Sequence, residues 1–140
     1  AALADGTVDA IATDHAPHAA HRKDQPFEDA PPGMVGLETA LSLTLTELVR
    51  PGVLDLGRAL ALLSWQPARI AGLTDHGGPI APGRPAHLCV IDPEERWTVD
   101  PARTAGKSRN NPYAGRELVG RVRHTFLGGE PVVLDGEVQR

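Results

Sequence analysis

One short stretch near the start of the chain limits the possible folds more than any other. Residues 8–12, Val-Asp-Ala-Ile-Ala, form a largely apolar run, and such a run without regular alternation is typical of a parallel strand covered on both faces. Pro17 has no backbone N–H and disfavours helix at the preceding residue, so the strand should end near Asp14. We therefore expect a buried strand whose carboxyl end carries Asp14, His15 and His18. In barrels of parallel strands, this end carries the chemistry.

A carboxylate followed by two imidazoles has two interpretations. Asp14 can bind zinc or take a proton from a water molecule. His18 can hydrogen-bond a substrate group or, when protonated, bind an anion. Alternatively, Asp14 caps the following turn and the histidines are solvated, because aspartate is common in turns. These residue types alone leave both interpretations open.

Composition excludes several classes of protein. The chain has 140 residues, of which 41% are hydrophobic and 23% charged, as in globular proteins. Its 14 basic and 18 acidic residues give a net charge of -4, which argues against a nucleic-acid partner. The single cysteine cannot form an internal disulfide. Neither a membrane span nor a signal peptide is recognisable, so we expect a cytoplasmic protein without a membrane partner.

Helices are predicted in the first half of the chain. Apolar residues at helical spacing over residues 37–48 predict a helix that Pro51 ends. Residues 41–46 also alternate as a strand would, but the pattern extends over more than a dozen residues, so we predict a helix. Asp55 should cap a second helix that runs to about Leu63.

Turn-forming residues delimit the other elements of this half. Pro67 should occupy the first position of a third helix that Gly72 closes. Residues 1–4 are expected to be the tail of a helix, ended by the turn at residues 5–6. Residues 19–32 contain three prolines and predict a long loop, a kind of segment that is often functional.

The pattern changes from helical to β after residue 74. Glycines and prolines between residues 77 and 85 mark the boundary. Gly128 and Gly129 predict the turn of a hairpin. We therefore expect an antiparallel sheet with strands at residues 86–91, 97–99, 118–127 and 131–138.

Several blocks of sequence resemble the dihydroorotase family, in its bacterial type within the amidohydrolase superfamily. The first block, Ile-Ala-Thr-Asp-His-Ala-Pro-His at residues 11–18, is specific to dihydroorotases. The Pro-Ala-Arg and Pro-Gly-x-x-Ala blocks are shared with related cyclic amidohydrolases. The resemblance extends through residues 33–40, 66–73, 80–86 and 107–113.

The resemblance implies an α/β fold, a (β/α)8 barrel with an appended β-sandwich. Residues 1–73 correspond to the C-terminal end of the barrel, with its last strand, active-site loop and helices. Residues 74–140 correspond to the C-terminal part of the sandwich. The His-x-His with which the family's metal centre begins is absent from this sequence. We therefore expect a C-terminal fragment that is inactive by itself.

The resemblance also implies an activity and the residues that perform it. Dihydroorotases reversibly cyclise N-carbamoyl-L-aspartate to dihydroorotate in pyrimidine biosynthesis, using one or two zinc ions. Asp14 matches the residue that binds metal and shuttles the proton. His18, Pro32 and Gly33 match substrate-contacting positions, although many relatives carry a large residue where this chain has Pro32, which removes a backbone donor. His15 is expected to have a structural role.

Two alternatives remain open at this stage. One is a related cyclic amidohydrolase, namely a hydantoinase, dihydropyrimidinase or allantoinase. The other is a non-catalytic dihydroorotase-like partner of aspartate transcarbamoylase. A homodimer is also a possible assembly, and the expected ligand is a small molecule in every catalytic case.

The remaining polar residues are interpreted as structural. Residues 107–113 are expected to form a loop that fixes the sheet to the barrel, with Tyr113 as its apolar anchor and Arg109 without an anion. Glu38 lies near a helix start, where a carboxylate is favoured. Four histidines are expected at the surface or in structural roles: His21, His76, His87 and His124.

Overall fold

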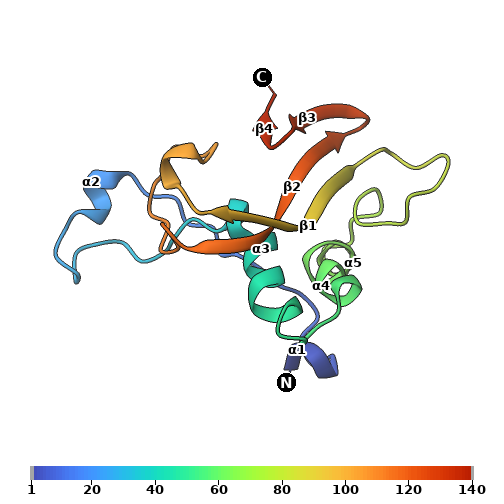
Figure 1. Cartoon of the computed structure of the whole chain (residues 1–140), viewed down its shortest axis with the longest axis horizontal. Coiled ribbons are helices and arrows are strands. Elements are labelled where there is room, and N and C mark those ends of the chain that lie inside the picture. The colour runs from blue at the N-terminus through green and yellow to red at the C-terminus, as the bar shows by residue number, and fades with distance from the viewer. Residues whose placement is uncertain (1, 140) are drawn as a thin grey trace.

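The computed structural model describes residues 2–139, and it joins a helical first half to a four-stranded sheet (Figure 1). The helices are α1 (Ala2–Asp5), α2 (Ala20–Lys23), the 3-10 helix η1 (Leu37–Thr39), α3 (Ala40–Thr44), the π-helix η2 (Leu45–Val49), α4 (Leu56–Leu63) and α5 (Trp65–Ile70). The strands are β1 (Leu88–Thr98), β2 (Glu117–Leu127), β3 (Glu130–Leu134) and β4 (Glu137–Val138), with the 3-10 helix η3 (Pro101–Arg103) between β1 and β2. The predicted change from helices to strands is confirmed.

The helix predicted before Pro51 is confirmed. Helices η1, α3 and η2 follow one another without a break from residue 37 to residue 49, so the strand alternative for residues 41–46 is wrong. The segment ends in a wide turn, in which the N–H of Arg50 donates to the carbonyl of Leu45 at 2.9 Å. Pro51 cannot continue the pattern because it has no N–H.

The capping prediction for α4 is confirmed, whereas the start of α5 is not as predicted. The carboxylate of Asp55 accepts a hydrogen bond from the Arg58 N–H at 2.7 Å. Helix α5 begins at Trp65, so Pro67 is its third residue rather than its first. Proline fits there because the N–H groups of a first helical turn have no partner within the helix. Gly72 follows the helix with φ +69°.

The beginning of the chain agrees in part with prediction. Helix α1 covers residues 2–5 and is followed by Gly6 at φ +87°, while Ala1 lies outside the described residues. The predicted loop over residues 19–32 contains the single-turn helix α2. None of the helices between residues 2 and 139 combines the length and apolarity that a membrane crossing needs.

The sheet is antiparallel, with strand order β1-β2-β3-β4. The strands predicted at 86–91 and 97–99 are one strand, because β1 continues through two shifts of register along β2. At the second shift, the Asp92 carboxylate accepts from the N–H groups of Glu94 and Glu95 at 2.9 and 3.1 Å, replacing ladder bonds. The hairpin at Gly128 and Gly129 is confirmed.

The final predicted strand is also corrected. Residues 131–138 do not form one strand, since β3 and β4 are separated by a turn at Asp135 and Gly136, with φ of +49° and +79°. A left-handed pair of residues of this kind is typical of a tight hairpin turn.

Helix α3 and strand β2 form the principal contact between the two halves. The Ser42 hydroxyl donates to the Gly120 carbonyl at 2.5 Å, and the Trp97 indole N–H lies 3.1 Å from both oxygens. Gly120 has φ +90°, and a Cβ on it would lie 2.2 Å from the Leu45 Cδ1 atom. Since Leu45 is only 2% exposed, the sheet can approach the helix this closely only at a glycine. These contacts fix the orientation of the helical segment on the sheet.

The buried strand predicted at residues 8–12 is wrong for this chain. These residues have no strand structure, and Val8 is 37% exposed. The Ile11 N–H donates to the Leu62 carbonyl at 2.9 Å, which attaches the segment to α4. The physical reason is that a parallel strand needs paired neighbours, and residues 2–139 provide none beyond an isolated parallel bridge between His15 and Met34.

Candidate functional site

Three loops meet beside the start of η1, and we call them the site loops: residues 14–18, 31–35 and 107–111. The N–H of Ala16 donates to the Met34 carbonyl at 2.9 Å, and the N–H of Val35 donates to the Asn110 carbonyl at 3.2 Å. The middle loop therefore lies between the other two. The site loops come from both halves of the sequence, because residues 107–111 lie after the first strand of the sheet.

Asp14 occupies the sharp bend of the first site loop. Its backbone has φ +44°, in the left-handed region, and its side chain is exposed. Aspartate tolerates this conformation better than most residues, at a cost of roughly 1–2 kcal/mol. The exposed carboxylate is accessible to a ligand.

His15 is bonded to the backbone at the start of η1. Its Nδ1 atom accepts from the N–H of Gly36 at 3.0 Å and lies 3.4 Å from the N–H of Leu37. An acceptor nitrogen carries no proton, so the proton of a neutral ring is on Nε2. This contact gives His15 a structural role and occupies the nitrogen nearest to the backbone.

A cavity of about 280 Å³ lies next to this ring, between the first and third site loops. Its wall includes His15, Glu38, Lys107 and Asn111. The Glu38 carboxylate accepts from the N–H groups of Ala105 and Gly106, at 3.1 and 3.2 Å. Glu38 therefore joins the start of the helix to residues 105–106, directly before the third site loop.

His18 and the Pro32-Gly33 pair, which the resemblance assigns to substrate contacts, lie next to each other. The His18 Nε2 atom lies 3.0 Å from the Pro32 carbonyl oxygen. Because a carbonyl only accepts, Nε2 carries the proton and donates. The other ring nitrogen, Nδ1, makes no hydrogen bond among the described residues, so it is the nitrogen left for a ligand.

Gly33 is held through its carbonyl oxygen, which has two donors. Its carbonyl oxygen lies 3.3 Å from the Lys23 Nζ atom and 3.3 Å from the Asn110 Nδ2 atom. It has φ +109°, and a Cβ would lie 2.5 Å from the Ala16 Cβ atom, so a glycine is required here. With both carbonyls of the Pro32-Gly33 pair engaged, the Gly33 N–H is the donor that this pair can offer to a ligand.

Lys23 and Asn110 are contributors that the sequence analysis missed. Lys23 also donates to the Pro31 carbonyl at 2.8 Å. Asn110 lies in the block at residues 107–113 that carries the family resemblance, and that position was its only available signal. Arg109, in contrast, bonds within its own loop, to the Thr104 hydroxyl at 3.0 Å and to the Gly106 carbonyl.

The carboxylate of Asp14 could bind zinc, but the site does not contain the further ligands that a zinc ion needs. An aspartate carboxylate is an ordinary zinc ligand, and structural or catalytic sites use three or four protein ligands. Among residues 2–139, no three His, Cys, Asp or Glu side chains are grouped closely enough to hold a metal ion. A zinc ion bound by Asp14 would therefore need ligands from outside these residues.

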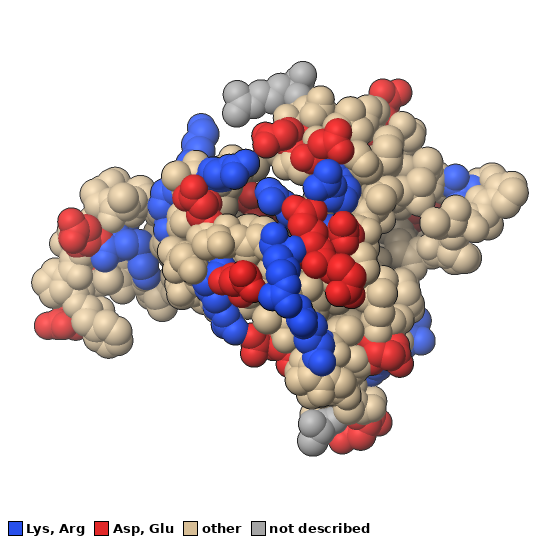
Figure 2. Space-filling view, in the orientation of Figure 1, with Lys and Arg blue, Asp and Glu red and all other residues tan. Residues whose placement is uncertain are grey.

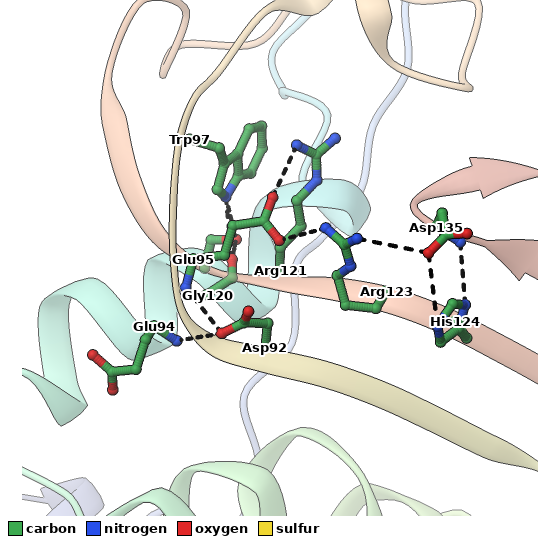
Figure 3. Close-up of polar contacts among 10 residues, drawn as sticks. Asp92, Glu94, Glu95, Trp97, Gly120, Arg121, Arg123, His124 and Asp135 are labelled. Atoms are coloured by element: carbon green, nitrogen blue, oxygen red, sulfur yellow. Dashed lines mark hydrogen bonds and ion pairs between the residues drawn. The ribbon is translucent and has the colours of Figure 1, made fainter.

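A second group of charged residues lies on the sheet (Figure 3). These residues pair with one another across neighbouring strands, so their clustering needs no ligand to explain it. Glu95 on β1 pairs with Arg123 and Arg121 on β2, at 2.8 and 3.6 Å, and Arg123 reaches Asp135 at 3.6 Å. The hydrogen bond that Arg123 donates to the Glu95 carboxylate raises the pKa of the Arg123 guanidinium. Partly exposed pairs of this kind contribute little stability individually.

Charge on the visible face is mixed rather than segregated. Figure 2 shows basic and acidic side chains interspersed across this face.

The histidines His76 and His87 stack with ring centroids 4.3 Å apart. His87 also accepts from the Gly128 N–H at 3.0 Å, so this contact supports the hairpin rather than a ligand site.

The sequence of this chain is similar to that of known proteins over nearly its whole length. The amidohydrolase family profile matches residues 4–133. A curated dihydroorotase of Streptomyces coelicolor is 50% identical over 137 residues, covering 98% of this chain and 32% of that protein. The dihydroorotase of Mycobacterium tuberculosis is 45% identical over 138 residues, covering 99% of this chain and 32% of that protein. The chain thus spans about a third of the length of these relatives.

Solved structures show the same arrangement of elements. A D-hydantoinase (dihydropyrimidinase) from Thermus sp. has a TM-score of 0.88 and 32% identity, covering 99% of this chain and 31% of that one. A dihydropyrimidinase from Brevibacillus agri has a TM-score of 0.89 and 25% identity, covering 98% of this chain and 31% of that one. Both similarities extend over almost the whole chain.

Proposed function

Because the chain belongs to the amidohydrolase family, we propose that it is the C-terminal third of a zinc-dependent dihydroorotase. The observation that carries the proposal is 45–50% identity to dihydroorotases along nearly all of this chain. The complete enzyme would interconvert N-carbamoyl-L-aspartate with dihydroorotate and water, in pyrimidine biosynthesis. We propose the cytoplasm as its compartment.

Within the complete enzyme, residues 1–73 would complete a (β/α)8 barrel and residues 74–140 would complete a β-sandwich. Residues 8–12 would then become the last barrel strand. Val8 is 37% exposed, so this apolar segment has surface that neighbouring strands could cover, as in a barrel whose parallel strands are paired on both sides.

Asp14 is the proposed metal ligand and proton carrier. Zinc, when bound, would supply Lewis acidity toward the ring amide carbonyl. The Asp14 carboxylate would take a proton from the attacking water and deliver it to the ring nitrogen as the amide bond breaks. Its exposure and its position at a sharp bend support this role.

His18 and Gly33 are proposed to orient the substrate. A protonated His18 can donate from Nδ1 to the substrate carboxylate while Nε2 stays bonded to Pro32. The Gly33 N–H would donate to an oxygen on the substrate ring. Pro32 would shape the substrate pocket through its fixed backbone conformation. The close approach of these groups supports one shared substrate pocket.

The alternatives are less well supported. The hydantoinase structures match the fold, but their identities of 25–32% are below those of the dihydroorotases. A non-catalytic partner of aspartate transcarbamoylase would have no need of Asp14 and His18, which are both present. Association with a transcarbamoylase, or as a homodimer, stays a prediction from the resemblance.

A chimaeric enzyme tests the proposal. Residues 1–140 would replace the aligned third of the Streptomyces coelicolor dihydroorotase, and the zinc-loaded chimaera would be assayed for ring opening. We expect turnover of dihydroorotate, with dihydrouracil and hydantoin as poor substrates. A folded, zinc-containing chimaera that hydrolyses dihydrouracil or hydantoin in preference to dihydroorotate would contradict the proposal. So would a chimaera inactive on all three.

A further inference from the structure

Asn110 belongs to the third site loop but bonds to the other two. Its Nδ2 atom lies 3.0 Å from the Ala16 carbonyl and 3.3 Å from the Gly33 carbonyl, and its Oδ1 atom lies 3.4 Å from the His18 N–H. We propose that Asn110 is a positioning residue, which sets the spacing between His18 and Gly33 and thereby the affinity for substrate. This inference rests on the proposed function.

The chemistry of the amide fixes its orientation. The two carbonyl oxygens can only accept, so the NH₂ group must face Ala16 and Gly33, whereas the His18 N–H can only donate and must face Oδ1. Asparagine supplies two donors and one acceptor in this arrangement. Aspartate has the same shape but would place an oxygen against two carbonyls.

The backbone of Asn110 strengthens the same connection. Its carbonyl accepts from the Val35 N–H at 3.2 Å, two residues after Gly33. One residue therefore contacts both partner loops through its side chain and the second of them also through its main chain. The contacts span 77 to 94 positions in sequence, so no local element could maintain this spacing.

The neighbouring asparagine provides a matched control. Asn111 is buried, and its Oδ1 atom accepts from the Tyr113 N–H at 2.9 Å within the same loop. None of its described side-chain hydrogen bonds reaches His18 or Gly33, and the cavity that it lines beside His15 is lined by neither of these two residues. Loss of the Asn111 side chain should therefore weaken the loop without changing the substrate pocket directly.

The bonds of Asn110 end on His18 and Gly33 and do not involve Asp14. Groups that bind substrate in both the ground and transition states affect KM, whereas the proton carrier affects kcat. A shift of the loops should therefore raise KM and leave kcat nearly unchanged. A purely structural residue would instead lower the unfolding temperature without such a separation.

The test uses the active chimaera with Asn110→Asp, Asn110→Ala and Asn111→Ala. We expect KM for dihydroorotate to rise about tenfold or more in both Asn110 variants, with kcat and zinc content nearly unchanged. Asn111→Ala should lower the unfolding temperature and keep the original KM. The KM result separates positioning from general stability.

Each other outcome counts against the inference. An active chimaera whose Asn110 variants keep the original KM would overturn it while leaving the proposed function intact. Loss of zinc or of folded structure in both variants would assign Asn110 to the fold alone. An unsubstituted chimaera without dihydroorotase activity would overturn the proposed function, and this inference with it.

Discussion

The sheet and the site loops lie side by side, but different interactions hold them. Strands β1 and β2 pair backbone to backbone and pack on the buried Leu45. The site loops are joined largely by side chains that bond to distant backbone groups, principally those of His18, Lys23 and Asn110. The sheet would keep its shape after many single side-chain changes, whereas the site loops depend on a few residues.

This difference separates stability from chemistry. A change in the packed region should lower the free energy of unfolding, while a change in the site loops should alter catalysis with little effect on folding. Substitutions at four positions follow, in order of expected effect, and the first concerns the exposed carboxylate.

Asp14→Asn should have the largest effect on activity. In the chimaera, we expect the rate of dihydroorotate hydrolysis to fall by about 10²- to 10⁴-fold, because an amide cannot carry the proton. Since Asp14 is exposed, the unfolding temperature should stay close to that of the parent. Steady-state kinetics with a thermal melt would measure both quantities. Substantial retained activity would exclude Asp14 as the proton carrier.

Gly120→Ala should have the largest effect on stability. Its new Cβ would collide with Leu45 at a backbone φ of +90°, and we expect a loss of about 2–4 kcal/mol. Urea unfolding followed by tryptophan fluorescence would measure the loss. Gly128→Ala is the control, because that glycine has φ +61° and open space around it, so about 1 kcal/mol is expected. Equal losses in the two variants would argue against the collision.

His18→Gln and His18→Asn distinguish the two ring nitrogens. The Gln amide can imitate the Nε2 donor that binds Pro32 but offers nothing at the position of Nδ1. The Asn amide imitates Nδ1. We expect KM to rise about tenfold in the Gln variant and less in the Asn variant. The reverse order would show that Nε2 contacts the substrate.

Thr7→Val should have the smallest effect, and only on stability. The Thr7 hydroxyl and N–H donate to Asp5, and these bonds lower the pKa of that carboxyl below its ordinary value of 3.8. A lowered folded-state pKa adds stability above the ordinary pKa, and this contribution is lost as the pH falls through the folded value. The small stability difference between parent and variant should therefore be present at pH 7 and shrink below about pH 3.8. A difference that grows on acidification would contradict this sign.

Local signals made much of the fold predictable. Pro51 and Asp55 act on their own neighbours, and both helix boundaries are confirmed. Strand β1 was divided in the prediction because its continuity past Asp92 depends on β2, about thirty residues later. The strand predicted at residues 8–12 failed for a similar reason, because a parallel strand depends on paired neighbours, and residues 2–139 supply only the isolated bridge between His15 and Met34.

The candidate site was predictable only where a motif carried it. The resemblance to dihydroorotases is confirmed by the relatives, and it singled out His18 and Gly33, which lie together. Their use as substrate groups stays a prediction. The contacts of Asn110 could not be predicted, because hydrogen bonds across more than seventy positions leave no periodic or local pattern in the sequence.

The hydrogen bonds of Asn110 also limit how this protein can be recombined. The β-rich second half of the chain looks like an exchangeable module, since it has its own sheet and follows a turn-rich junction. Any crossover between residues 33 and 110 nevertheless takes Asn110 from one parent and its bonding partners from another. Shuffled libraries of relatives should therefore retain activity only when both parents present the same backbone spacing across that junction.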